Sequence, residues 1–125
     1  PQGWPHLVTL RYGWYGNQLA VQGYAKSQKL LNVQRDPRVS LLVEDANCEY
    51  SAIKGVQILG RAEILDDPEA ARIVMESSLE SDPDFMVRSG LTAATPERIT
   101  EKRTALAIVP ERVVSWDHSR LNGVY

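Results

Sequence analysis

Strand-like and helix-like patterns follow one another in the first part of the chain. Residues 6–12 are mostly apolar or β-branched and residues 18–23 alternate polar with apolar side chains, so we predict two strands joined by a glycine-containing turn. Residues 26–34 place apolar side chains at helical spacing instead. The pair Asp36-Pro37 ends that pattern, because the residue before a proline avoids helical backbone angles. The sequence therefore predicts a β-hairpin followed by a short helix.

The middle of the chain is predicted to be mostly strand. Residues 39–43 form a compact apolar run, and residues 50–65 form a longer one that contains Gly55 and Gly60. Glycines inside a long strand often mark bulges or bends, and a small barrel needs such bends in order to close. We therefore expect the strands to close into a barrel.

Two short helices and two strands are predicted in the last part. Helices are expected at residues 68–79 and 96–102, because each begins with a capping side chain, a proline and a glutamate. The loop-like residues 81–94 lie between them, and strands are expected at 104–109 and 112–116. The whole pattern predicts one mainly β (α+β) domain over residues 1–125, with six or seven strands in a barrel and three short crossing helices.

Composition narrows the possible functions. A chain of 125 residues with 43% hydrophobic side chains can build one sizeable core. Its formal charge of -2 gives no overall basic field for nucleic acid, and no apolar run reaches the length of a membrane span. The lone Cys48 excludes an internal disulfide and, with only two histidines, provides too few ligands for a structural zinc site. We expect a cytoplasmic protein that binds neither metal, nucleic acid nor membrane.

The segment at the start of the first predicted helix has an unusual charge pattern. Lys26, Lys29 and Asn32 recur every three residues and would share a helical face. The amino end of a helix already carries positive partial charge, so two lysines there favour a bound anion, and Ser27 adds a hydroxyl donor. The alternative, that these are ordinary solvated lysines, has equal weight from this pattern alone.

Several runs of sequence resemble one known family. They are residues 3–10, 24–39, 55–63 and 110–117, and the second contains Lys-x-x-Asn-x-x-x-Asp-Pro-Arg. Together they resemble the flavin-binding split β-barrel proteins related to pyridoxamine 5′-phosphate oxidase, and within them the actinobacterial branch that uses the deazaflavin coenzyme F420. The resemblance implies an FMN-binding type of split barrel. A helix and a first strand normally open that barrel, and we expect residues 1–125 to lack both.

The resemblance also implies a site. Family members are homodimers that hold the cofactor at the subunit interface. Residues that would border the ring system are Val8, Thr9, Leu10 and Arg11; those that would hold the phosphate end are Tyr24, Ala25, Lys26, Ser27, Lys29 and Asn32. One position departs from the pattern, because many relatives have threonine or serine where this chain has Gly23. No catalytic residue is assigned, and the proton donor is left open among Tyr24, Arg11 and water.

The activity implied by the resemblance is that of an oxidoreductase. Such a protein would use F420, or alternatively FMN, to pass a hydride to a small electron-poor substrate, and residues 81–102 would cover the pocket. Two other interpretations stay open. The chain could bind a flavin, a deazaflavin or a tetrapyrrole-like anion without turnover, or it could be a dimeric scaffold that has lost its cofactor.

Overall fold

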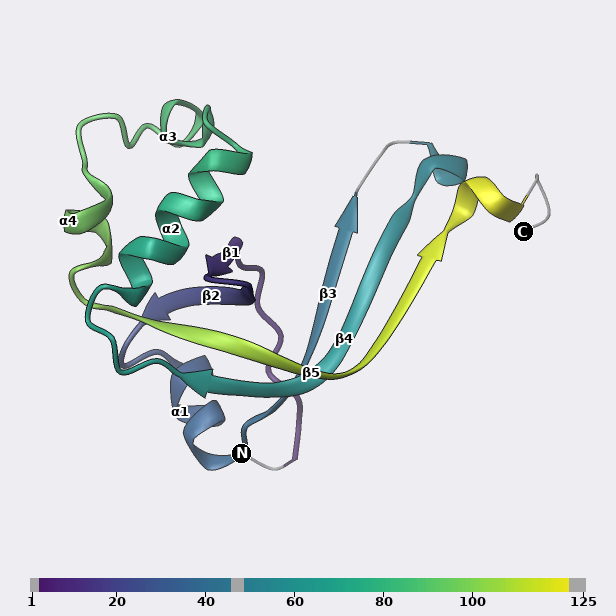
Figure 1. Ribbon diagram of the computed structural model, residues 1–125, viewed down its shortest axis with the longest axis horizontal. Coiled ribbons are helices and arrows are strands. Elements are labelled where there is room, and N and C mark those ends of the chain that lie inside the picture. The colour runs from purple at the N-terminus through teal and green to yellow at the C-terminus, as the bar shows by residue number, and fades with distance from the viewer. Residues whose placement is uncertain (1–2, 46–48, 122–125) are drawn as a thin grey trace. The chain divides into compact units, whose positions relative to one another are not determined.

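A computed structural model describes residues 3–45 and 49–121 and divides them into two compact units (Figure 1). The first unit comprises the chain up to Pro37 together with Ala62–Val109. The second unit comprises Arg38–Arg61 and the chain from Pro110 onward. Cys48 lies outside the described residues. The single domain expected from the sequence stays a prediction.

The described residues form five strands. Their bounds are β1 Tyr12–Tyr15, β2 Gln18–Tyr24, β3 Arg38–Asp45, β4 Lys54–Ile64 and β5 Arg103–Asp117. The strand order is β1-β2-β5-β4-β3, with β1 and β3 at the two edges. The prediction of a mainly β fold with short helices is confirmed. The split-barrel type of fold fits as well, although the described residues form five strands instead of the predicted six or seven and their sheet is not closed.

One cause of the lower count lies at Pro110. The sequence predicted two strands on either side of it, but β5 runs through this position as one strand of 15 residues. Proline lacks an N–H to donate, which ends a central strand but is tolerated where that N–H has no ladder partner. Pro110 is solvent-exposed, so the strand continues past it.

The first predicted strand is also wrong. Residues 4–11 have no regular secondary structure, and β1 occupies positions that were expected to be a turn. Apolar residues form a strand only where another strand accepts their hydrogen bonds, and residues 4–11 have no such neighbour in the described part of the chain. The hairpin turns instead at Gly16-Asn17, where Gly16 has a φ of 62°, a left-handed conformation suited to a two-residue loop.

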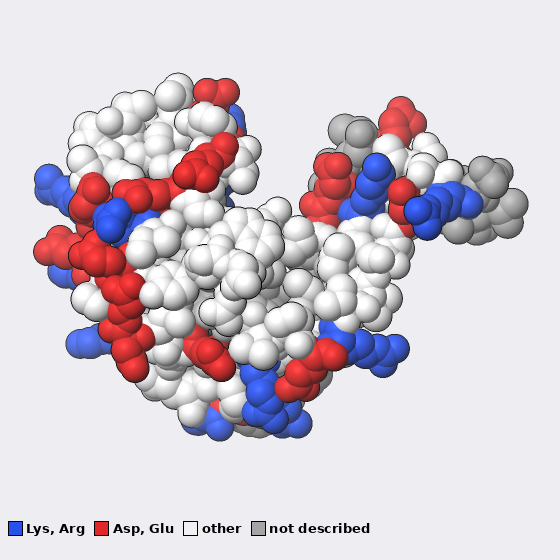
Figure 2. Space-filling view, in the orientation of Figure 1, with Lys and Arg blue, Asp and Glu red and all other residues white. Residues whose placement is uncertain are grey.

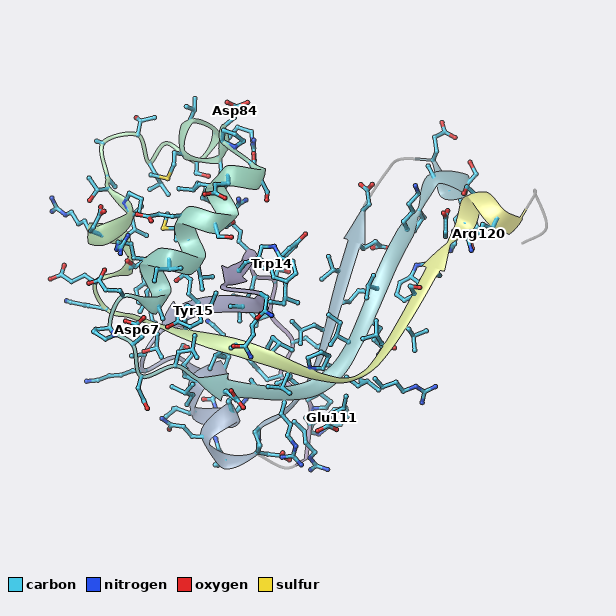
Figure 3. All side chains as sticks on the ribbon, in the orientation of Figure 1. Trp14, Tyr15, Asp67, Asp84, Glu111 and Arg120 are labelled. Atoms are coloured by element: carbon cyan, nitrogen blue, oxygen red, sulfur yellow. The ribbon has the colours of Figure 1, made fainter. Side chains whose placement is uncertain are left out.

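The helices are short, and among the described α-helices only the last begins with a side-chain cap. Their bounds are α1 Gln28–Arg35, α2 Ala70–Ser81, α3 Phe85–Arg88 and α4 Pro96–Thr100, with the 3-10 helices Tyr50–Ala52 and His118–Leu121. Helix α2 begins two residues later than predicted, with Glu69 and not Asp67 as its capping position. The Thr95 hydroxyl caps α4 as expected, accepting from the Arg98 N–H at 3.3 Å. Before α2, Asp67 accepts from the Glu69 N–H at 2.9 Å and from the Tyr15 hydroxyl at 2.8 Å (Figure 3). These two donors lower the pKa of Asp67.

The core of the first unit is built from small side chains. Helix α2 packs on β1 and β2. The buried cluster beneath it consists of Ala20, Ala70, Val74 and Ala105, with Tyr15 and Leu65 packed against it. Gly13 in β1 makes the closest approach, because a Cβ placed there would lie 2.2 Å from the Val74 carbonyl oxygen. The helix can therefore lie directly on the strand.

The second unit consists mainly of strands and has little buried core. Strand β3 pairs with β4 without interruption from Arg38↔Arg61 to Asp45↔Lys54, so neither Gly55 nor Gly60 marks a bulge in this ladder. Gly55 instead makes room for an indole, since a Cβ there would lie 2.4 Å from Trp116 Cζ2. No hydrophobic side chain among the described residues of this unit is fully buried.

Candidate functional site

The chain turns between β2 and α1 at a junction fixed by backbone hydrogen bonds. The Ala25 N–H donates to the Lys102 carbonyl at 3.1 Å, and the Ser27 N–H donates to the Tyr24 carbonyl at 2.9 Å. The Ser27 carbonyl in turn accepts from the Leu30 N–H at 3.1 Å. Six predicted phosphate-end residues therefore lie on one anchored segment.

Ser27 lies at the start of α1, and its hydroxyl group has an unusual environment. Its backbone is extended, with φ −71° and ψ 156°, as in a helix-capping residue, but its side chain caps no N–H of the helix. The Ser27 Oγ atom is buried and has no hydrogen-bond partner among the described residues. Leaving a buried hydroxyl unpaired costs about 1–3 kcal/mol, so this atom is suited to donate to an acceptor at the helix start.

The two lysines of the segment lie in different settings. Helix α1 begins at Gln28, two residues later than predicted, so Lys26 lies in the preceding turn and does not share a helical face with Lys29 and Asn32. The extended backbone of Ser27 causes the difference. Lys26 is exposed, and neither lysine forms an ion pair with a described residue.

Lys29 reaches back across β2. A Cβ placed on Gly23 would lie 2.3 Å from Lys29 Cε and 2.6 Å from its Nζ atom. The ammonium group therefore lies against the strand at a buried glycine. Sequence reasoning identified both residues but not their contact, although a glycine inside a strand is a signal of close approach.

Asn32 is partly engaged by its own helix. Its Oδ1 atom accepts from Gln28 Nε2 at 2.8 Å and from Arg35 Nη2 at 3.2 Å. These bonds orient the amide, and they occupy the oxygen of Asn32. The donor end of Asn32 is the part that an anion could use.

Arg103 belongs to the same junction and was missed from the sequence. Its guanidinium lies 4.5 Å from the centroid of the Tyr24 ring, and its Nη1 atom donates to Gln22 Oε1 at 3.0 Å. Its Nε atom is buried without a partner among the described residues. Arg103 pairs with Tyr24 across β2 and β5, a neighbourhood that no local pattern reveals.

The ring-end residues lie in a different part of the first unit. Val8 and Thr9 are exposed, in a segment without regular structure. Leu10 and Arg11 line a groove of about 300 Å³, whose other lining residues are Tyr12, Gly13, Trp14, Ser78, Ser81 and Asp82. No hydrogen bond between described residues joins these ring-end residues to the junction at Ser27.

Arg11 is held firmly in that groove. Its Nη1 atom donates to Asp82 Oδ2 at 3.2 Å and its Nη2 atom to Ser78 Oγ at 3.1 Å, while the guanidinium lies 3.7 Å from the centroid of the Phe85 ring. Asp82 also accepts from Arg88. The hydrogen bonds from Arg88 and, to a smaller extent, Arg11 lower the pKa of Asp82 to about 2.

The Asp82 pairs predict an acid-sensitive contribution to stability. The carboxyl has a lower pKa in the folded chain than its ordinary value near 4, so its contribution is complete above pH ~4. It is lost as the pH falls through about 2. We expect the melting temperature of Asp82→Asn to lie below that of the parent at pH 5 and to converge with it near pH 2.

The matched control for this prediction is Asp84→Asn, which removes a neighbouring acid that forms no hydrogen bond with Arg11. It should follow the parent closely from pH 5 to pH 2. Identical melting temperatures of Asp82→Asn and the parent at every pH would contradict the assignment.

Other features of the described residues add little to this site. They contain no group of three metal-ligating side chains, and none of their helices combines the length and apolar character needed to cross a membrane. Figure 2 shows acidic and basic side chains next to each other on the visible face of the first unit. Arg72, for example, is paired with both Glu69 and Glu76, at 2.6 and 2.9 Å.

The described residues form a five-stranded antiparallel sheet with short connecting helices, and the split β-barrel fold fits this arrangement although the sheet is not closed. The family model described as pyridoxamine 5′-phosphate oxidase matches residues 1–117, and the chain belongs to that family. Comparison with curated proteins gave no match.

Solved structures agree with this assignment. A conserved hypothetical protein from Mycobacterium tuberculosis is 35% identical with a TM-score of 0.79, over 100% of this chain and 76% of the other. An F420 reductase is 21% identical with a TM-score of 0.61, over 91% and 82% of the two chains. An FAD-binding protein from Mesorhizobium loti is 24% identical with a TM-score of 0.58, over 92% and 78%. The last two are evidence for the fold alone.

Proposed function

We propose that this chain is an oxidoreductase that binds F420, or alternatively FMN, and passes a hydride to a small electron-poor substrate. The observation that carries the proposal is the buried Ser27 hydroxyl at the start of α1, which has no hydrogen-bond partner in the described part of the chain. The same segment bears two lysines that form no ion pair with a described residue. The F420 reductase and the FAD-binding protein among the structural neighbours are consistent with this class of cofactor.

The residues at the junction fit the anionic end of such a cofactor. Residues 24–35 contain three cationic side chains and no aspartate or glutamate. The Ser27 hydroxyl, the Lys29 ammonium and the first amide groups of α1 are all donors, and the helix dipole adds to their effect. Charge-assisted hydrogen bonds from such groups are the strong contacts in phosphate recognition.

The groove at Leu10 and Arg11 would border the ring system. Its lining includes the partly exposed Tyr12 and Trp14, which offer apolar and aromatic surface to a flat ring. Arg11 is oriented by Asp82 and Ser78, so its charge has a fixed position beside that surface. When bound, the cofactor supplies the hydride chemistry, while these side chains bind it, orient it and exclude water.

A homodimer with the cofactor at the subunit interface is part of the proposal. The first unit exposes Trp4 at 81% and Leu7 at 88%, and the second exposes Leu42 at 63% and Val113 at 57%. Exposed apolar surface on a sheet without a core of its own favours burial against a second copy. We expect sedimentation velocity to give a dimer at micromolar concentration. A stable monomer would contradict an interface site.

Turnover separates an enzyme from a binding protein. The chain loaded with reduced F420 or reduced FMN should reoxidise the cofactor in a stopped-flow absorbance experiment when an electron-poor acceptor such as menadione is added. The rate should exceed that of free reduced cofactor with the same acceptor. Tight binding without faster reoxidation by quinone or nitro acceptors would favour the non-catalytic interpretation.

A further inference from the structure

Gly23 is a buried glycine, and the charged end of the Lys29 side chain occupies the space that a side chain at this position would fill. It pairs with Thr104 in the ladder between β2 and β5, and its φ is not left-handed. A Cβ there would have Lys29 Cε, Nζ and Cδ as its three nearest atoms, at 2.3, 2.6 and 3.7 Å. Neither the backbone angle nor a neighbouring backbone atom requires glycine at this position.

Two other buried glycines, Gly13 and Gly55, have neighbours of a different kind. At Gly13 the added Cβ would meet the backbone of α2, and at Gly55 it would meet the ring of Trp116. Both therefore permit close packing of rigid groups. Gly23 differs because its neighbour is the flexible end of a lysine, which could point into water at no steric cost. The glycine provides a place for the ammonium group to rest against the strand.

We propose that Gly23 is a positioning residue, which holds the Lys29 ammonium at the strand-to-helix junction so that it meets the anionic end of the cofactor. This inference rests on the proposed function. A free lysine side chain loses rotational freedom when it binds a phosphate, and one already held against the strand loses less. Ser27, whose buried hydroxyl has no partner among the described residues, precedes Lys29 by two residues at the start of α1.

A side chain at position 23 would compete with Lys29 for the same space. Even the Cβ of a serine or threonine there would enter the space that Lys29 occupies. Glycine at this position therefore leaves room for an ammonium donor that reaches the strand from the helix.

The test compares four proteins: the parent, Gly23→Ala, Lys29→Met and the double variant. Each is titrated by fluorescence with the one of F420 and FMN that the parent binds, and with the same ring system lacking the phosphate, which is riboflavin for FMN and the deazariboflavin analogue for F420. We expect Gly23→Ala to weaken binding of the cofactor at least fivefold and to change binding of the phosphate-free analogue less than twofold. In the Lys29→Met background, Gly23→Ala should have no further effect on cofactor binding.

A second measurement needs no cofactor. In the parent, Lys29 should react with acetic anhydride more slowly than the exposed Lys26, as measured by peptide mass spectrometry. In Gly23→Ala the two rates should become similar. The melting temperature of Gly23→Ala should equal or exceed that of the parent, because alanine replaces glycine in a strand without backbone strain.

Different results would overturn the positioning role of Gly23 and the proposed function. Three results would each overturn the positioning role while leaving the proposed function intact. They are equal losses of affinity for the cofactor and its phosphate-free analogue, a loss of cofactor affinity that persists in the Lys29→Met background, and unchanged cofactor affinity in Gly23→Ala. A parent protein that binds neither FMN nor F420 would overturn the proposed function itself, and the positioning role with it.

Discussion

Replacing Gly13 by alanine is expected to destabilise the chain by about 3 kcal/mol, the upper end of the usual cost of overpacking. The added methyl group would lie 2.2 Å from the Val74 carbonyl oxygen and 3.1 Å from the Ser78 nitrogen. Both are backbone atoms of α2, so the helix must move away from β1 to admit it. That movement would also disturb the hydrogen bond from the Trp14 N–H to Ser77 Oγ, at 3.0 Å.

Urea denaturation followed by tryptophan fluorescence measures this effect. Gly23→Ala is the matched control, because it adds the same methyl group to a neighbouring strand where only the Lys29 side chain must move. We expect a clear fall of the urea midpoint for Gly13→Ala and none for the control. Equal midpoints for Gly13→Ala and the parent would show that α2 does not lie directly on β1.

The second large effect is on binding. Lys29→Ala should weaken binding of the anionic cofactor by about 1–3 kcal/mol, the usual contribution of a charge-assisted hydrogen bond. This corresponds to roughly a 5- to 150-fold rise in Kd. The side chain lies against β2 at the start of α1, where it has no ion-pair partner among the described residues to compete with a phosphate.

Calorimetric or fluorescence titration of the variant tests this prediction. Lys54→Ala is the control, since it removes a lysine of β4 in the second unit and leaves the junction intact. Its affinity for the cofactor should match that of the parent. If Lys29→Ala binds as tightly as Lys54→Ala does, Lys29 is not part of the site.

Features that depend on neighbouring residues in the sequence could be predicted well. The end of α1 before Pro37 and the start of α4 at its Thr95 cap follow from local backbone chemistry, and both lie where the sequence placed them. The segment from Tyr24 to Asn32 is also continuous, so a charge pattern in the sequence could identify it as one candidate site.

Features that depend on residues far apart in the sequence could not be predicted. Residues 6–12 have the composition of a strand, but strand formation depends on a partner that composition does not supply. Arg11 lies on Asp82 and Ser78, and Tyr24 lies under Arg103, through contacts between residues far apart in the chain. A glycine inside a strand predicts that some other group lies close to it, but the sequence does not show that this group is Lys29.

The most direct test of the proposed function is a fluorescence titration of the purified protein with F420 and, separately, with FMN. The absorption spectrum recorded beforehand detects any cofactor carried through purification. We expect saturable binding of one of the two, with one cofactor per chain and a strong dependence on Lys29. Failure to bind either cofactor would contradict the proposal, and the lysines at the start of α1 would then be ordinary surface residues.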